Sequence, residues 1–342
     1  MSDDYPKLQG LSILKEKSSS KNSVIYISKN ESLNKITILK SIKKESLSPK
    51  LYEMLKRERE FYSSNISSDL FPSFINPYKD DKNLYIEMSF FEGVNLSKLL
   101  VEEQLLNFSD KEKSNFNLYL NLIAQIIYMI YVLHSNNYCY RDLKLNNLII
   151  NKNLKLSLVD FGFIKKLENT EKKTDTICGT FHMKAPEIFL ASEGKLKEYN
   201  PFCYDIYSIG VIIYEIYYGK PPFKYYFDKE VNMDEYKKIL YKGIDDSYFD
   251  NNINKDLKNL IMKCLNIDPM KRPFIKDIIQ DKLWESFGGF EKMRKLNDSL
   301  AIISNDEQTN KILEFIKFEG DFSSDYEYID EKKKMGDLFA DF

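Results

Sequence analysis

The chain has 342 residues, of which 43% are hydrophobic and 30% are charged. This length exceeds the size at which a single core usually stops growing, so we expect two lobes or two small domains. The 50 Lys and Arg residues nearly balance the 52 Asp and Glu residues, which argues against a protein that binds nucleic acid or an anionic membrane surface.

Cysteine spacing and apolar runs indicate the compartment. The four cysteines are scattered without a paired metal-type spacing, so we expect free thiols. No uninterrupted apolar run reaches the ~18 residues that span a bilayer. The first residues match neither a signal peptide nor a myristoylation site. We therefore expect no membrane insertion and a cytoplasmic location, with access to the nucleus.

The first part of the chain predicts a small antiparallel sheet with one helix. A polar turn at 17–23 separates two strand-like segments, 11–14 and 24–27, as in a hairpin. Further strands are predicted at 35–40 and 84–88. Between them, apolar residues and Glu58 share one face of a helix near 49–62.

The remainder predicts a larger and mainly helical lobe. Residues 116–134 carry a broad apolar face at helical spacing, and shorter helices are predicted at 205–218, 233–242 and 256–265. After Trp284 the chain becomes highly charged, which favours an extended tail that wraps the core. We assign an N-lobe at 1–88, a hinge at 89–92, a C-lobe at 93–290 and a C-terminal tail at 291–342.

Polar clusters next to apolar segments indicate where the chemistry lies. The segment Tyr140-Arg-Asp-Leu-Lys-Leu-Asn-Asn147 follows the long helix and precedes an apolar triplet, and Asp160-Phe-Gly162 follows an apolar strand. Ala185-Pro-Glu187 then closes a polar loop. Polar groups so near a core must pair with each other, with a metal or with a ligand.

In this order and context, these motifs resemble the signature of eukaryotic protein kinases. The resemblance implies an α+β fold with two lobes, ATP and Mg²⁺ as cofactors, and phosphoryl transfer to protein hydroxyls. It also implies that Asp142 accepts the substrate proton, that Lys144 stabilises the moving phosphoryl group, and that Asn147 and Asp160 hold magnesium.

The resemblance further implies a lysine that holds the nucleotide phosphates and a glutamate that orients it. Lys40 is favoured because Ile36, Ile38 and Lys40 alternate along one strand, although Lys43 is a competing match. Glu58 is the helix residue best placed to pair with Lys40, and Glu60 is the alternative.

A nucleotide pocket is expected around the predicted hinge. Met88 would guard its back, the backbone at Ser89 and Phe91 would bond the adenine edge, and apolar side chains would sandwich the ring. We expect these apolar residues to be Val24, Ile38, Phe90 and Ile149, although each could simply be part of the core.

The phosphate-binding loop departs from the kinase pattern because it contains no glycine. Counted from Val24, the glycine positions are occupied by Lys17, Ser19 and Asn22. Glycine permits the closest approach of backbone amides to phosphates, so the sequence also supports a second hypothesis, a pseudokinase or scaffold with weak nucleotide binding.

Further residues resemble the AGC group of kinases, specifically the catalytic subunit of cyclic-AMP-dependent protein kinase. Tyr140 stands where most kinases carry histidine, and the segments 160–166, 176–180 and 205–211 are similar to that family. The tail is similar too and ends in Phe339-Ala-Asp-Phe342, which would dock on the first lobe. The resemblance allows for a regulatory subunit or an activating kinase as partners.

Substrate class and regulation follow from the same resemblance. Lys144 and Thr180 indicate a serine/threonine kinase that acts on protein substrates, and Glu215 would receive a basic substrate side chain. Thr176 resembles an activation-loop phosphosite whose phosphate would pair with Arg141 and Lys165. Glu187 would form a structural pair with Arg272.

Overall fold

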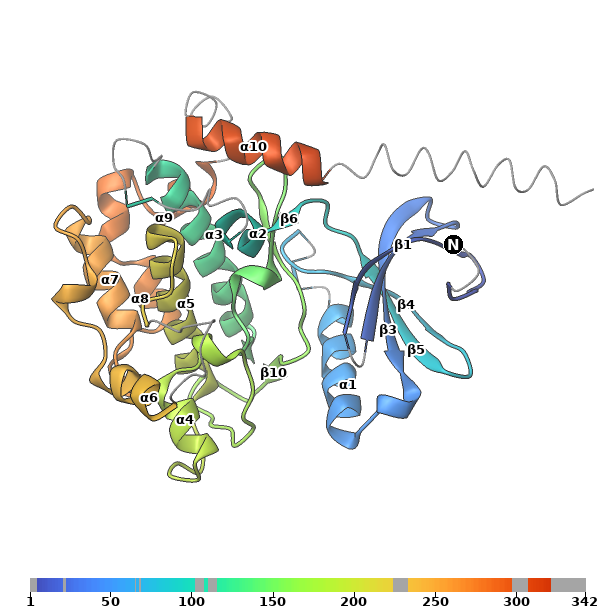
Figure 1. Ribbon diagram of the computed structural model, residues 1–342, viewed down its shortest axis with the longest axis horizontal. Coiled ribbons are helices and arrows are strands. Elements are labelled where there is room, and N and C mark those ends of the chain that lie inside the picture. Colours follow the sequence, from blue (N-terminus) through green and yellow to red (C-terminus); the bar gives the residue numbers. More distant parts are fainter. Residues whose placement is uncertain are drawn as a thin grey trace, which may run out of the picture. The chain divides into compact units, whose positions relative to one another are not determined.

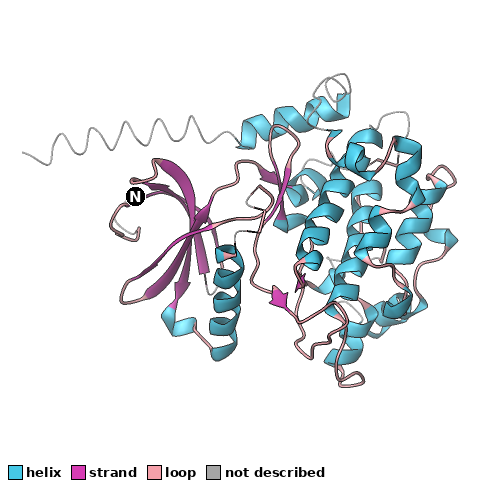
Figure 2. Cartoon of the chain, turned by 180° about the vertical axis from the view of Figure 1, so that it is seen from behind, coloured by secondary structure: helices cyan, strands magenta, loops and turns pink. Residues whose placement is uncertain are grey.

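The computed structural model describes residues 5–20, 23–64, 66–67, 69–101, 108–109, 116–223, 233–296 and 307–320. The described residues up to Gly93 form one compact unit, and Val94–Ile316 form a second. Strands gather in the first unit and helices in the second (Figure 1, Figure 2). This is the antiparallel-sheet lobe and the helical lobe that the sequence predicts.

The first unit is a five-stranded antiparallel sheet with one long helix beside it (Figure 1). The strand order is β1-β2-β3-β5-β4. The elements are β1 (Leu11–Ser19), β2 (Ser23–Asn30), β3 (Lys35–Lys43), α1 (Pro49–Ser63), β4 (Phe74–Lys79) and β5 (Asn83–Ser89). Strand β4, which the sequence analysis did not predict, lies at the sheet edge, where Pro77 is tolerated because one side needs no ladder bond.

One face of this sheet carries its own apolar cluster. The buried side chains of Leu11, Tyr26, Leu39 and Tyr85 form its centre. Tyr5, which precedes β1, packs edge-on against Tyr26 with ring centroids 5.9 Å apart. Because side chains alternate between faces of a strand, this cluster also identifies which residues point away from Lys40.

The second unit is built around two buried helices, α3 (Phe116–Ser135) and α5 (Pro201–Tyr218). By length and composition α3 could cross a membrane, but 78% of its apolar window is buried inside the protein, as in a core helix. The other helices are α2 (Leu96–Val101), α4 (Pro186–Ser192), α6 (Met233–Lys242), α7 (Lys255–Cys264), α8 (Ile275–Ile279), α9 (Phe290–Arg294) and α10 (Glu307–Gly320).

Short strands in the second unit hold the loops that carry the predicted catalytic residues. Strands β6 (Val94–Asn95), β8 (Leu148–Ile150) and β9 (Leu156–Leu158) form one antiparallel sheet in the order β6-β8-β9. Strands β7 (Tyr138–Cys139) and β10 (Lys165–Lys166) form a second. The predicted catalytic loop, Tyr140–Asn147, runs between β7 and β8, and Asp160 follows β9.

The predicted tail is described only in part, and that part is helical. In α10, Ile312 and Ile316 are buried, and the Lys98 ammonium of α2 lies 5.4 Å from the centre of the Phe315 ring. This section of the tail therefore packs on the second unit. Residues 297–306 and 321–342, which include the predicted docking segment Phe339–Phe342, lie outside the described residues.

Candidate active site

A buried ion pair joins Lys40 of β3 to Glu58 of α1. The Lys40 ammonium donates hydrogen bonds to both Glu58 carboxylate oxygens, at 2.9 and 2.8 Å. The Glu58 side chain is only 1% exposed, and the Tyr62 hydroxyl donates a further bond to Oε1 at 2.9 Å. A carboxylate so deeply buried requires such partners, so this pair fixes the direction of the Lys40 side chain.

Local sequence signals position Glu58. Ser48 caps the start of helix α1, because its side-chain oxygen accepts the Leu51 amide at 3.2 Å, and Pro49 occupies the first helical position. Glu58 and Tyr62 stand four residues apart and therefore share one helix face. The hydroxyl of Tyr62 consequently reaches Glu58 from within the same helix.

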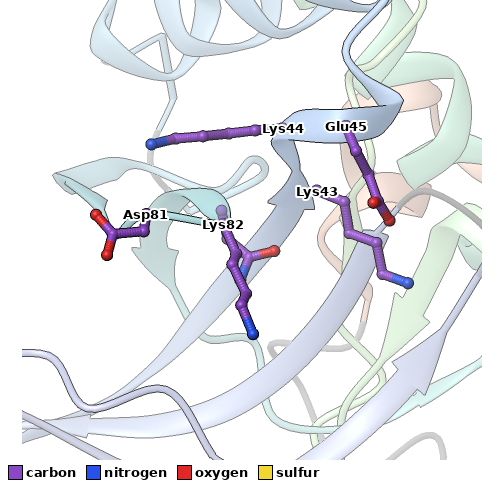
Figure 3. A pocket seen from close by; sticks show the side chains of 6 residues that line it. Lys43, Lys44, Glu45, Asp81 and Lys82 are labelled. Carbon is purple, nitrogen blue, oxygen red and sulfur yellow. The ribbon is translucent and has the colours of Figure 1, made fainter.

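The alternative residues lie elsewhere. Lys43, at the end of β3, is exposed and lines an open hollow with Lys44, Glu45, Asp81 and Lys82 (Figure 3). Glu60 is exposed on α1. The structure therefore pairs Lys40 with Glu58 and gives neither Lys43 nor Glu60 that position.

Strand register shows which residues share the face of Lys40. Lys40 stands opposite Ile25 on β2 and Ile86 on β5, and Ile38 stands opposite Met88. Directly opposite residues of an antiparallel pair project to the same face. Ile38 and Met88, both predicted to line the nucleotide pocket, therefore lie on the Lys40 face.

Val24 does not share that face, which corrects the sequence prediction. It packs against the apolar cluster of Leu11 and Tyr26 on the opposite face. Ile25, one residue later, takes the position beside Lys40. The error arose because side-chain direction has a period of two, so a shift of one residue moves a side chain to the other face.

The same shift affects the predicted phosphate loop. Ser19 pairs with Val24 and so lies on the face away from Lys40, whereas Ser18 pairs with Ile25. Lys17 occupies an irregularity in the β1 ladder, and its ammonium lies 5.6 Å from the centre of the Phe90 ring. Asn22 lies outside the described residues.

Two serines, Ser20 and Ser23, bond to each other at the ends of the turn between β1 and β2. The Ser20 hydroxyl lies 3.0 Å from the Ser23 hydroxyl and donates to the Ser23 carbonyl at 3.1 Å. The predicted hinge residues follow at the end of β5. The Ser89 hydroxyl accepts the Ser73 amide at 2.9 Å, and Phe91 is half-buried.

In the second unit, Asp142 is the centre of a compact polar cluster. Its Oδ2 atom accepts the Lys144 ammonium at 2.7 Å and the Asn147 side-chain amide at 3.3 Å. Its Oδ1 atom accepts the hydroxyl of Thr180 at 2.7 Å and the Thr180 amide at 2.9 Å. Lys144 also donates to the Thr180 hydroxyl at 3.0 Å, so all four predicted residues converge.

Asp205 supports this cluster, a role that the sequence analysis did not identify. It is completely buried in α5 and accepts the backbone amides of Tyr140 at 2.8 Å and Arg141 at 2.7 Å. The His134 ring nitrogen lies 2.9 Å from the same carboxylate. Arg141 has a φ angle of +68°, which is rare for a residue other than glycine. Asp205 therefore holds the catalytic loop in a strained conformation.

Asp160 lies next to this loop with an exposed side chain. Its φ angle is +63°, and its backbone carbonyl accepts the Tyr140 hydroxyl at 3.0 Å. Tyr140 also packs edge-on against the buried Phe161, with ring centroids 5.3 Å apart. The tyrosine thus joins the catalytic loop to the segment that carries Asp160.

The side-chain oxygen atoms of Asn147 and Asp160 are of the kind that magnesium prefers as ligands. The backbone amide of Val159 bonds the Asn147 carbonyl at 2.9 Å, which brings Asn147 next to the residue that precedes Asp160. Among the described residues there is no group of three or more His, Cys, Asp or Glu suited to a metal. Magnesium commonly takes one or two protein oxygen ligands together with substrate phosphates and waters, and one amide and one carboxylate match this pattern.

The predicted regulatory residues surround the backbone at Thr174–Thr176. Arg141 donates to the carbonyls of Phe163 at 2.8 Å and Thr176 at 3.4 Å. Lys165, however, donates to the hydroxyl of Thr174, at 2.8 Å. Arg141 and Lys165 therefore both approach this segment, and Thr176 itself is half-buried.

The structure places three further sets of predicted residues away from the Asp142 cluster: the Glu187–Arg272 pair, Ile149 and Glu215. Glu187 and Arg272 form a buried two-pronged ion pair, with N–O distances of 2.6 and 2.8 Å. Ile149 is buried in β8, opposite Asn95 and Ser157. Burial raises the pKa of the Glu215 carboxyl to about 7, and no described residue forms an ion pair or hydrogen bond with it.

Comparison with known proteins identifies the family. Residues 19–284 match the protein kinase domain. The chain belongs to the protein kinase family. The chain is 32% identical over 247 residues to a probable serine/threonine-protein kinase, CCRP1, of Zea mays, with 72% of this chain and 36% of that protein covered.

Other relatives carry different kinase names. The cell cycle serine/threonine-protein kinase CDC5/MSD2 of Saccharomyces cerevisiae is 33% identical over 248 residues, with 71% of this chain and 31% of that protein covered. A cGMP-dependent protein kinase of Drosophila melanogaster is 36% identical over 195 residues, with 57% and 19% covered. The chain spans about a third of the length of the first two relatives.

Proposed function

We propose that this chain is an ATP- and Mg²⁺-dependent serine/threonine protein kinase that phosphorylates protein hydroxyls. The observation that carries the proposal is the hydrogen-bonded group of Asp142, Lys144 and Thr180. A threonine hydroxyl already donates to Asp142 Oδ1 at 2.7 Å, which is the bond that a substrate hydroxyl needs with a general base.

Each residue then has a role in phosphoryl transfer. Asp142 orients the substrate hydroxyl and accepts its proton. Lys144, which bonds both Asp142 and Thr180, supplies positive charge where the phosphoryl group moves. Magnesium, when bound, neutralises phosphate charge, and Asn147 and Asp160 are the residues that would hold it. In the first unit, Lys40 binds nucleotide phosphates while Glu58 and Tyr62 fix its direction.

The kinase group is a finer proposal. Tyr140 and the segments similar to the cyclic-AMP-dependent kinase catalytic subunit support membership of the AGC group, and the similarity to a cGMP-dependent kinase agrees with it. Two other relatives, a probable kinase named PLK from Dictyostelium discoideum and CDC5, do not carry the name of a cyclic-nucleotide-dependent kinase, and their similarity speaks for a group other than AGC. We retain the AGC proposal because of Tyr140. We also propose that the protein acts in the cytoplasm, and that an activating kinase or a regulatory subunit is its partner.

A transfer assay tests the proposed activity. Purified protein, radiolabelled ATP, Mg²⁺ and a mixture of serine and threonine peptides should give labelled peptide. Asp142→Asn and Asp160→Asn should each lower the rate by at least ~10²-fold, because each removes a charge used in chemistry. Circular dichroism and melting temperature should remain near wild type. Transfer by Asp160→Asn at the wild-type rate would show that the metal assignment is wrong.

The glycine-free turn supports a second candidate, a pseudokinase that acts as a scaffold. The described residues that flank the turn between β1 and β2, Ser20 and Ser23, are serines that bond to each other, whereas the kinase pattern places glycine amides near phosphates in this segment. If the wild-type protein transfers no phosphate to any peptide or to itself while it remains folded, the scaffold function is favoured.

A further inference from the structure

Strand β1 contains two irregularities in its pairing with β2, at Leu14 and at Lys17, and the second sets the direction of its last residues relative to Glu16. Glu16 pairs with Tyr26, whereas Ser18 pairs with Ile25, so Lys17 is an extra residue in the ladder. Without it, regular alternation would place Ser18 on the same face as Glu16. A bulge of this kind re-aims side chains and is common next to active sites.

As a result, Ser18 lies on the face that carries Lys40. Ser18 pairs with Ile25, and Ile25 pairs with Lys40, so the three residues form one row across β1, β2 and β3. Two strand spacings separate Ser18 from Lys40, which corresponds to roughly 10 Å between their backbones. Ser18 is exposed, so its hydroxyl is accessible to a ligand on this face.

We propose that the Ser18 hydroxyl binds the phosphate chain of the nucleotide, together with Lys40. This inference rests on the proposed ATP-dependent function and names a phosphate-binding residue that the kinase pattern does not supply. A serine carries a hydrogen-bond donor on its side chain, so it can reach a phosphate oxygen without the close backbone approach that glycine allows. A bond from a hydroxyl to a charged phosphate oxygen is also stronger than one between neutral groups.

Ser19 provides a matched control within the same strand. It is also an exposed serine, but it pairs with Val24 on the opposite face. Sequence spacing alone would favour Ser19, whereas strand register favours Ser18. The two hypotheses therefore predict different results for two adjacent residues of the same type.

Isothermal titration of the full-length protein with Mg²⁺ and ATP tests the proposal. Ser18→Ala should weaken ATP binding by about 10-fold, the usual scale for losing one hydrogen bond to a charged group. Ser18→Asp should weaken it further because its carboxylate repels the phosphates. Ser19→Ala should bind ATP as the wild type does. Adenosine, which has no phosphate, should bind wild type and Ser18→Ala equally.

The outcomes separate this inference from the proposed function. Equal ATP affinity of wild type and Ser18→Ala, or equal losses in Ser18→Ala and Ser19→Ala, would overturn the proposed role of Ser18. Neither result would contradict the proposed ATP-dependent function. A loss that appears with adenosine as well as ATP would do the same, because it would show a general change in the pocket. A folded wild-type protein that binds no ATP would overturn the proposed ATP dependence, and the role of Ser18 with it.

Discussion

The two units hold their candidate functional residues in different ways. In the second unit, Asp142, Lys144 and Asn147 are neighbours in the sequence and bond to one another, and Asp205 supports them from a buried helix. In the first unit, Ser18, Ile25 and Lys40 come from three strands and share a face only through ladder register. A short polar loop can therefore be recognised as a motif, whereas a sheet face requires the pairing of strands.

The largest effect of a single substitution is expected at Asp205, because the catalytic cluster of the second unit depends on its carboxylate. Asp205→Ala leaves two backbone amides unpaired in a buried site and should lower the free energy of unfolding by about 3–5 kcal/mol. Transfer activity should fall with it, because Arg141 loses the bond that holds its positive φ. Asp205→Asn keeps one acceptor oxygen and should have an intermediate effect. Chemical denaturation measures the free energy of unfolding of both variants. An unchanged value for Asp205→Ala would contradict the proposal that Asp205 supports the loop at Tyr140 and Arg141.

Disrupting the pair in the first unit should affect rate more than stability. Glu58→Gln leaves Lys40 without its carboxylate partner and should lower kcat/KM by roughly 10- to 100-fold, because a misplaced positioning group has effects of this size. Tyr62→Phe removes one bond to Glu58 and should have a smaller effect. Glu60→Gln, on the exposed side of α1, is the control. Steady-state kinetics with varied ATP would reject the assignment if both glutamate variants behaved alike.

The smallest predicted effect concerns the pH dependence at Glu215. Burial raises the pKa of this carboxyl to about 7, above its ordinary value near 4.3. The folded protein therefore binds more protons than the unfolded chain between these values, so Glu215 lowers stability progressively as the pH rises through this window. Glu215→Gln should gain roughly 1–3 kcal/mol relative to wild type between pH 4.5 and pH 8.

Melting temperatures measured across that range check this prediction. The difference between Glu215→Gln and wild type should grow with pH and level off above pH 8. A difference that is constant across the range would show that Glu215 titrates at its ordinary value. A basic peptide substrate that binds Glu215 should lower its pKa and reduce the difference.

Sequence patterns were sufficient for most elements and for the order of the catalytic motifs. Helices α3, α6 and α7 follow their predicted ranges to within one residue, since helical spacing of apolar residues extends over many turns and tolerates local exceptions. Tyr140–Asn147 and Asp160–Gly162 were recognisable because their polar residues are contiguous and flanked by apolar strands. Strand β4 was missed because it is an edge strand that contains proline and carries little apolar alternation.

Only the tertiary structure decided which side chains share a face and which contacts support the catalytic loop. Extra residues at Leu14 and Lys17 each shift the pairing of β1 against β2 by one residue, and composition does not reveal such bulges. Pairing also decides between Val24 and Ile25, because Ile25 stands opposite Lys40 in the ladder of β2 and β3. Asp205 stands more than sixty positions after Arg141 in the chain, so its bonds to the loop depend on the packing of α5. Side-chain direction in a strand and long-range contacts are set by pairing and packing, which a single sequence records only indirectly.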